Sequence, residues 1–308
     1  MRIDLTNQFK SFAQFRVPFD LYAFDRATNG GLPAGKLSEI YGDYDTGKTR
    51  LALHVIANTL KLGGKAVLID IERSLDKGLA DLCELDVAHK NFFYPNPNLI
   101  SSIEDVFTVL DLSIKELREN NPDGLLTFVW DSVAMTPGVA DLEREIGANN
   151  MAAAQRAKVI GDELKKLMIE VYRHKICLLF INQIRDKVGV MFGEKTQTVG
   201  GKAIKFAAAL RMHVKAVGKL KDTKLEETIG YKGRMIVDKC KVGIPFHKVE
   251  FEMFVDKPID PYSGLFDYMR RHSEIESSGA WYNFVGDKKK WHGDDFVVQL
   301  KRWSTEHK

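Results

Sequence analysis

The chain has 308 residues, of which 44% are hydrophobic, and its net charge is only +3. No apolar run is long enough to span a bilayer, and the polar, basic start "MRIDLTNQFK" lacks a secretory signal, so we expect no membrane segment. Cys83, Cys177 and Cys240 stand far apart, so their spacing indicates neither a disulfide framework nor a zinc site, and a cytoplasmic location is predicted. Any nucleic-acid binding must come from local basic patches.

The predicted elements alternate along the chain. After a phenylalanine-rich segment at residues 1–27, short apolar runs alternate with stretches whose apolar residues recur every three or four positions. The runs are "LSEIY" (37–41), "AVLID" (66–70), "LLTFVWD" (125–131) and "ICLLFIN" (176–182). This alternation predicts an α/β fold in which helices flank a mostly parallel central sheet. Later β-like runs extend the expected core over residues 28–255, and residues 256–308 form a small, polar C-terminal module.

The stretch "EIYGDYDTGKTR" (39–50) has the spacing of a phosphate-binding loop: a glycine, four residues, then Gly-Lys-Thr. Backbone N–H groups and a helix N-terminus hold the phosphates in such a loop, so Asp43 and Asp45 can point outward. Lys48 would reach the β- and γ-phosphates of ATP, and the Thr49 hydroxyl would bind Mg²⁺. The alternative is a glycine turn that matches by chance. The predicted nucleotide contacts here are Gly42, Asp43, Tyr44, Asp45, Thr46, Gly47, Lys48, Thr49 and Arg50.

Two strand ends carry the carboxylates that ATP hydrolysis requires. The run "LLTFVWDS" places Asp131 where a Walker B acid would support the metal, although a strand-ending aspartate can also cap the next turn. The run "AVLIDIER" places Asp70 and Glu72 on one face by the two-residue period of a strand. Glu72 could polarise a water molecule beside the γ-phosphate, whereas we expect Asp70 to be structural.

Several blocks together resemble the RecA family of homologous-recombination ATPases. They are "GGLPAGKLSEIYGDYDTGKT", "LIDIERSLD", "FVWDSVAMTP", "FINQIRDKVGVMFGEKTQTVGGKAIKFAAALRM" and "GAWYNFVGDK", in this order. "PIDPYSGLFD" is similar to the phage branch typified by UvsX. The resemblance implies a RecA-like P-loop ATPase core that uses ATP and Mg²⁺, with Glu72 as catalytic base and Gln183 as γ-phosphate sensor. It places Asp76 near the adenine, but Leu79 stands where bacterial members carry a tyrosine, so base stacking there and the nucleotide preference stay open.

Residues 186–201, "DKVGVMFGEKTQTVGG", form a glycine-rich stretch with flanking cations. Such a loop suits single-stranded nucleic acid, because the cations hold the backbone and Phe192 offers an apolar face. The resemblance identifies it as the second DNA loop and "EREIGANNMAAAQR" as the first. The alternatives are a solvated surface loop and, at Met151, the start of a buried helix face. The predicted DNA contacts are Met151, Arg156, Arg185, Lys187, Phe192, Lys195, Gly200 and Gly201.

The stretch "VDKCKVG" places Lys239 and Lys241 two apart in a predicted strand, so both project from one face. They are either edge lysines that discourage aggregation or, as the resemblance to bacterial members implies, catalytic lysines that reach the ATP of a neighbouring subunit. Such head-to-tail contacts generate a helical filament when they do not close. In the N-terminal segment, Phe9, Phe12 and Phe15 either provide a docking edge for this oligomer or pack on the core.

The predicted function is an ATP-dependent recombinase of a bacterial or phage-infected cell. As a DNA-dependent ATPase it would form a filament on single-stranded DNA, pair it with homologous duplex DNA and exchange strands. A single-strand-binding protein and a loading mediator are the further partners expected. Two alternatives stay open: a ring-shaped, helicase-like motor with a RecA core, and a single-strand-binding or annealing protein with a vestigial ATPase. Closed rings would favour the first, and pairing unaffected by Lys48→Ala the second.

Overall fold

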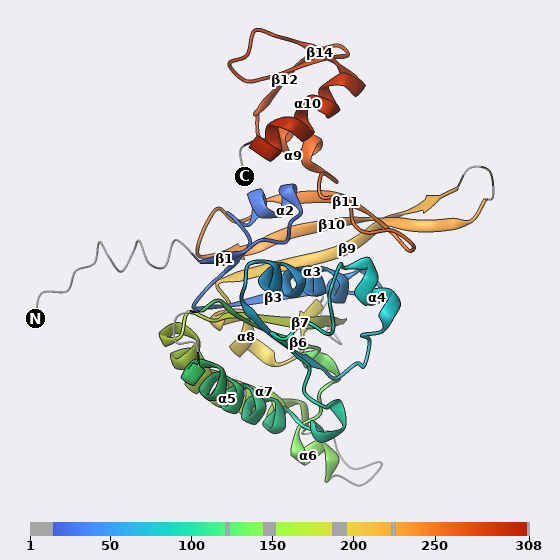
Figure 1. Ribbon diagram of the computed structural model, residues 1–308. Coiled ribbons are helices and arrows are strands. Elements are labelled where there is room, and N and C mark those ends of the chain that lie inside the picture. The colour runs from blue at the N-terminus through green and yellow to red at the C-terminus, as the bar shows by residue number, and fades with distance from the viewer. Residues whose placement is uncertain are drawn as a thin grey trace, which may run out of the picture.

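A large central sheet dominates the computed structural model in Figure 1. The described residues are 15–120, 124–143, 152–186, 196–222, 224 and 226–306. They form a nine-stranded sheet of order β11-β10-β9-β3-β7-β6-β4-β5, with β8 paired to β7. Its strands are β3 (Lys36–Gly42), β4 (Lys65–Asp70), β5 (Phe92–Phe93), β6 (Leu126–Asp131), β7 (Cys177–Asp186), β8 (Thr196–Thr198), β9 (Leu210–Lys221), β10 (Thr228–Cys240) and β11 (Lys248–Phe254). The pairs from β9 through β3, β7, β6 and β4 to β5 are parallel, which confirms the predicted α/β fold.

Helices cover both faces of this sheet. Adjacent strand residues point to opposite faces, and the strands carry apolar side chains on both, so each face packs against helices. Ile40 and the α3 residue Leu51 belong to one hydrophobic cluster, whereas Leu37, Val106 of α5 and Ile160 of α7 belong to the other. The helices here are α3 (Lys48–Lys61), α4 (Lys77–Leu82), α5 (Ile103–Asn120), α6 (Val139–Leu142), α7 (Ala152–Arg173) and α8 (Gly201–Ala207), with short 3-10 turns at Pro97–Leu99 and Val133–Met135. No helix in the described ranges has the length and apolar character needed to cross a membrane.

The described end of the N-terminal segment packs on the core. Strand β1 (Arg16–Val17) pairs with β2 (Leu32–Pro33), and α2 (Tyr22–Ala27) contacts β11. Phe19 is fully buried, whereas Phe15 is partly exposed. Phe9 and Phe12, two of the three predicted docking residues, lie outside the described residues, so a role of residues 1–27 in joining subunits stays a prediction.

The later β-like runs extend the sheet as antiparallel strands. β10 pairs with both β9 and β11, and the β9–β10 hairpin reaches beyond the neighbouring strands (Figure 1). Only residues 210–213 of β9 pair with β3, so the remainder of β9 continues past the edge at which β3 ends. That edge is where β3 leads into the phosphate loop.

A small C-terminal unit follows the sheet. It contains α9 (Leu265–Arg271), α10 (Gly293–Glu306) and the antiparallel strands β12 (Ile275–Ser278), β13 (Trp281–Phe284) and β14 (Trp291–His292). The rings of Phe284, Phe296 and Trp303 pack together inside it. In Figure 1 this unit lies beyond β11, and α9 packs against that strand. The boundary proposed at residue 256 falls in the loop between β11 and α9.

Candidate active site at the carboxyl edge of the sheet

The phosphate loop connects the end of β3 to the start of α3, at the edge where the parallel strands end. Gly47 adopts a left-handed conformation with φ of +80°, and a Cβ atom there would lie 2.3 Å from the Tyr231 hydroxyl. At Gly42, a Cβ atom would lie 2.0 Å from the main-chain oxygen of Val214. Neither position has room for a side chain. Both glycines of the motif are therefore required by the close packing of β9 and β10 against the loop.

The side chains of the loop divide into outward and inward sets. Asp43, Tyr44 and Asp45 are exposed, with 83% of Tyr44 accessible, whereas Thr46 and Lys48 are buried. Both acids therefore point outward, as the sequence predicts. The Lys48 ammonium donates to the main-chain carbonyl of Asp43 and, at 3.4 Å, to the Thr46 hydroxyl. Its partners are thus atoms of its own loop.

Burial lowers the pKa of Lys48 from its ordinary value, while the nearby carboxylates of Asp131 and Glu72 raise it. The cation is therefore held next to two acids that come from other strands. This arrangement concentrates opposite charges at one edge of the sheet, as in sites that bind a phosphate group together with a metal ion.

Asp131, at the end of β6, has unused bonding capacity. The Thr49 hydroxyl donates to its Oδ2 at 2.6 Å, but its Oδ1 is buried and has no hydrogen-bond partner among the described residues. Burial raises the pKa of this carboxyl group to about 7, an effect increased by Glu72 and Asp70 and opposed by the Thr49 bond. A carboxylate and a hydroxyl are oxygen ligands that Mg²⁺ prefers. Thr49 and Asp131 therefore fit a magnesium ion.

Glu72 lies two residues after β4, and two neighbours orient it. The Ser132 hydroxyl and the Gln183 amide both donate to Glu72 Oε1, the latter at 3.0 Å. Strands β4, β6 and β7 thus bring together the predicted base and the predicted γ-phosphate sensor. Sequence reasoning missed Ser132, although its place directly after Asp131 at a strand end is a signal that could have found it.

The remaining acids of this edge hold the backbone. Asp70 accepts hydrogen bonds from the main-chain N–H groups of Ser74 and Leu75, at 3.2 and 3.0 Å, and from the Tyr94 hydroxyl. These contacts fit the structural role expected of it. Asp76 caps α4 by accepting from the N–H of Leu79 at 2.7 Å, so its place near the adenine stays a prediction. The Arg50 side chain contacts β11 rather than the phosphate loop.

Comparison with known proteins decides the family. A family model described as "RecA N-terminal domain" matches residues 16–260. The protein named Protein RecA from Syntrophobacter fumaroxidans is 35% identical over 259 residues, which cover 84% of this chain and 71% of that protein. Protein RecA from Aquifex aeolicus is 35% identical over 292 residues, 94% of this chain and 79% of that protein. The chain belongs to the RecA family.

Family membership makes this chain a RecA-type recombinase and an ATPase. Protein RecA from Methylococcus capsulatus, 34% identical over 92% of the chain and 78% of its own length, agrees with this assignment. The ring-motor and annealing alternatives are not favoured. The relatives named here are bacterial, so the similarity to the phage branch gains no support.

The predicted DNA contacts are only partly described. Met151, Lys187, Phe192 and Lys195 lie outside the described residues. Arg185 is exposed on β7 and pairs in register with Gln197 of β8, so an antiparallel ribbon joins the start of the predicted second RecA DNA loop to residues 196–198 within it. At the ribbon's exit, the paired glycines 200 and 201 have φ of +88° and +68° as α8 begins.

Arg156, predicted for the first DNA loop, forms an ion pair in the described structure. Its Nη1 lies 3.3 Å from Asp141 Oδ2, and both side chains are largely buried. Asp141 also accepts from the N–H of Gly138 at 2.8 Å, so the pair joins α7 to the start of α6. DNA binding by Arg156 would require the guanidinium to leave this partner.

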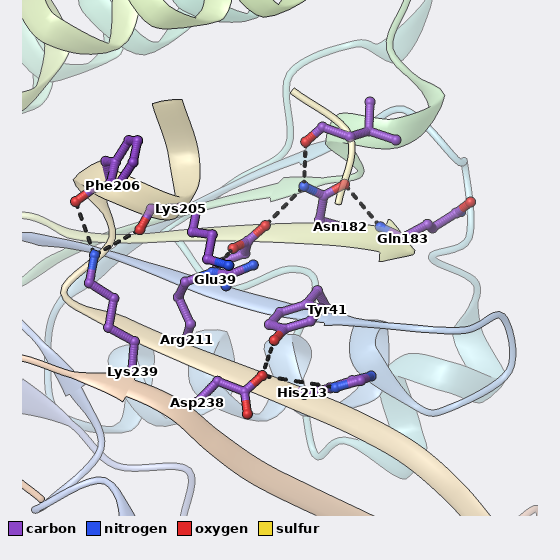
Figure 2. Close-up of polar contacts among 11 residues, drawn as sticks. Glu39, Tyr41, Asn182, Gln183, Lys205, Phe206, Arg211, His213, Asp238 and Lys239 are labelled. Carbon is purple, nitrogen blue, oxygen red and sulfur yellow. Dashed lines mark hydrogen bonds and ion pairs between the residues drawn. The ribbon is translucent and has the colours of Figure 1, made fainter. Parts of the chain in front are cut away.

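The predicted intersubunit lysines lie at the end of β10. The Lys239 ammonium donates to the main-chain carbonyls of Lys205 and Phe206, at 2.7 and 3.0 Å, at the C-terminal end of α8 (Figure 2). A cation is favourable there because of the helix dipole. Lys241 follows the last residue of β10 and is exposed, and its main-chain N–H donates to the carbonyl of Ala209 at 2.7 Å.

A second polar cluster, which sequence reasoning missed, is buried beside the site. Glu39 of β3 accepts from the Asn182 amide at 2.9 Å and from the Arg211 guanidinium at 2.5 Å (Figure 2). The Asn182 amide also donates to the carbonyl of Val199, just before α8, and its oxygen accepts from the N–H of Gln183. The signal was a polar residue inside each of three apolar strand runs.

Proposed function

We propose that this RecA-family chain is a DNA-dependent ATPase that forms a helical filament on single-stranded DNA. In this form it pairs the bound strand with homologous duplex DNA and exchanges strands. One observation carries the proposal. Gln183 donates to Glu72 at the nucleotide edge, and three residues later the same strand ends in the ribbon that borders the predicted DNA loop. Strand β7 therefore belongs to both sites.

The proposed hydrolysis uses the groups at this edge. The N–H groups of residues 42–49 and the start of α3 hold the phosphates, and Lys48 exchanges the Asp43 carbonyl for phosphate oxygens. Glu72, oriented by Ser132 and Gln183, accepts the proton of the attacking water molecule.

Thr49 and Asp131 would hold Mg²⁺, which when bound neutralises phosphate charge. Phosphate oxygens and water would complete its coordination, as is usual for Mg²⁺ bound together with a nucleotide.

The proposed coupling to DNA depends on the Gln183 amide. This group has two alternative acceptors, the Glu72 carboxylate and a γ-phosphate oxygen, so the presence of ATP changes which atom it binds. Because Gln183 lies on β7, the change reaches the β7–β8 ribbon. ATP then favours the DNA-bound filament and hydrolysis favours release. A single-strand-binding protein and a loading mediator are the further partners that this role implies.

The proposed filament places ATP between subunits. Lys239 and Lys241 of one copy would reach the nucleotide of the next and stabilise the negative charge of the transition state, as an arginine finger does. Lys239 would then leave the end of α8, whose first residue, Gly201, is the last residue of the predicted DNA loop. Assembly and DNA grip would therefore respond to the same nucleotide.

The test measures ATP hydrolysis by the full chain with and without single-stranded DNA, together with negative-stain imaging. We expect DNA to raise the rate by about tenfold or more and to give filaments with ATP. Lys48→Ala should abolish hydrolysis, whereas the control Lys61→Ala, on the same helix but paired with the exposed Glu84, should not. Phe192→Ala should impair the response to DNA while sparing nucleotide affinity.

Three outcomes would contradict the proposal. A wild-type protein that stays monomeric with ATP and oligonucleotide together would exclude the filament. Closed rings with directional unwinding would indicate a motor. Homologous pairing that Lys48→Ala leaves unchanged would indicate an annealing protein with a vestigial ATPase.

A further inference from the structure

Arg50 follows Thr49 in the first turn of α3, but its side chain leaves the phosphate loop. The residue is only 6% exposed. Its Nη1 donates to the main-chain carbonyl of Phe254 at 2.5 Å, and its Nη2 donates to that of Lys257. Phe254 is the last residue of β11. One guanidinium thus holds the end of the outermost strand, and the loop after it, against the helix that begins at the phosphate loop.

The same region of β10 and β11 also contacts the phosphate loop directly. A Cβ atom at Gly47 would lie 2.3 Å from the Tyr231 hydroxyl and 2.6 Å from Cε of Met253, so both side chains pack on the loop backbone. The Tyr231 hydroxyl lies 2.8 Å from the Met253 sulfur, which joins the two strands. We call Tyr231, Met253 and the main chain of residues 254–257 the backing wall of the loop.

We propose that Arg50 is a positioning residue that fixes the backing wall to α3 and thereby keeps the phosphate loop in its nucleotide-binding conformation. The inference rests on the proposed function, because it presupposes ATP at this loop. Buried bonds from a charged donor are short and strong, and a planar guanidinium can hold two carbonyl groups at once. Without Arg50, the wall and the loop move independently, and binding of the phosphates must then reorder them.

The chain offers a matched control in Arg118 of α5. Arg118 is 7% exposed, and its two terminal nitrogens donate to the main-chain carbonyls of Gly124 and His174, each at 2.6 Å. The two arginines are similarly buried and each donates to two main-chain carbonyl groups, but α5 packs in the hydrophobic cluster on the other face of the sheet from α3. Arg50→Met and Arg118→Met should lower the melting temperature by similar amounts.

The experiment measures the dissociation constant and KM for MgATP in the full chain. Arg50→Met should raise both by about tenfold and change kcat by less than about twofold, because the chemical groups stay in place. Arg118→Met should leave both unchanged. Arg50→Lys, which keeps the charge but not the planar fork, should give about a threefold increase.

Equal dissociation constants for Arg50→Met and Arg118→Met would overturn the inference and leave Arg50 as a stabilising residue only. If Arg50→Met does not fold, Arg50→Lys decides the question, and an unchanged dissociation constant in that variant overturns it. Failure of the proposed function would look different. The wild-type protein would then not bind MgATP, or Lys48→Ala would bind it as tightly as the wild-type protein does.

Discussion

Two buried polar clusters differ in how completely their groups are paired. The Glu39 cluster (Glu39, Asn182 and Arg211) joins β3, β7 and β9, whereas the nucleotide cluster (Lys48, Thr49 and Asp131) joins the start of α3 to the end of β6. In the Glu39 cluster, both carboxylate oxygens have partners, one the Asn182 amide and the other the Arg211 guanidinium. In the nucleotide cluster, Asp131 keeps one oxygen without a partner among the described residues, and the Lys48 ammonium binds atoms of its own loop. Glu39 and Asp131 are 0% and 1% exposed.

Burial alone therefore does not separate a scaffold from a binding site. Buried polar groups in native proteins are normally hydrogen-bonded, so the group that stays unpaired is the informative one. In the Glu39 cluster both carboxylate oxygens are hydrogen-bonded within the protein, and the bonds join three strands. In the nucleotide cluster an oxygen of Asp131 can still bind a ligand. Each variant below tests one side of this difference.

The largest expected effect is on folding, from Arg211→Met. The variant leaves the Glu39 carboxylate buried with a single partner, which should reduce the free energy of unfolding by about 3–5 kcal/mol. Chemical denaturation measures the loss. Lys115→Met, which breaks an exposed ion pair with Asp111, is the control and should cost less than about 1 kcal/mol. Similar losses in the two variants would show that the buried cluster is not a scaffold.

Glu72→Gln should lower the rate of ATP hydrolysis by about 100-fold or more, since a glutamine cannot accept the proton of water. Affinity for MgATP should change little, because the glutamine oxygen still accepts the bonds from Ser132 and Gln183. The variant should assemble on DNA but fail to release it. Steady-state hydrolysis and DNA dissociation test this, with the exposed Glu84→Gln as control; rapid turnover by Glu72→Gln would refute its role as base.

Asp131 should make MgATP binding depend on pH. Its pKa is raised to about 7, and the metal requires the carboxylate, so affinity should fall by about tenfold between pH 8 and pH 6. Binding measured at pH 6, 7 and 8 tests this. Because the pKa of Asp131 is higher in the folded protein than in the unfolded chain, protonation of this carboxyl group stabilises the folded state. This stabilisation is complete below the ordinary pKa of aspartate and is lost as the pH rises through about 7.

Asp25 provides the control for that experiment. Burial raises its pKa to about 7 as well, and its carboxylate accepts from the N–H of Phe19, within the N-terminal packing. Asp25→Asn should therefore change the pH dependence of stability but leave that of MgATP binding intact. If MgATP affinity stayed constant from pH 6 to pH 8 in the wild-type protein, the assignment of Asp131 as metal ligand would be refuted.

The smallest expected effect is that of Tyr41→Phe. The Tyr41 hydroxyl donates to Asp238, while its ring stacks on His213 and lies 4.4 Å below the Arg211 guanidinium. Loss of the hydroxyl alone should cost about 1 kcal/mol in denaturation and leave hydrolysis unchanged. A strong effect on hydrolysis would mean that the Glu39 cluster, which Tyr41 contacts through Arg211, takes part in the chemistry and is not only a scaffold.

The sequence predicts the strand–loop–helix unit and the strand-end acids well, because these features are local. The spacing of the glycines, Lys48 and Thr49 indicates a turn that leads into the next helix, and Asp131 ends a mostly apolar run. Parallel strands place their carboxyl ends at one edge, so Glu72, Asp131 and Gln183 could be expected to meet there.

Contacts between distant segments could not be predicted in the same way. Arg50 and Phe254 are 204 residues apart, and nothing local in "GKTR" indicates that the arginine turns away from the phosphates. Similarly, the two-residue period places Lys239 on one face of a strand but does not reveal its bonds to the end of α8. Such partners depend on which strands become neighbours in the sheet.

The position of Lys239 has a consequence for short assemblies. This residue lies on β10, which β9 separates from the strand that carries the phosphate loop, and its described bonds are to the end of α8. In the proposed filament each nucleotide receives lysines from the neighbouring copy, so the nucleotide at one end of the row has no such neighbour. A row of protomers therefore contains one fewer complete catalytic centre than it has protomers. Turnover per protomer should then increase with oligonucleotide length and level off, and the length at half-maximum would report the size of the smallest competent cluster.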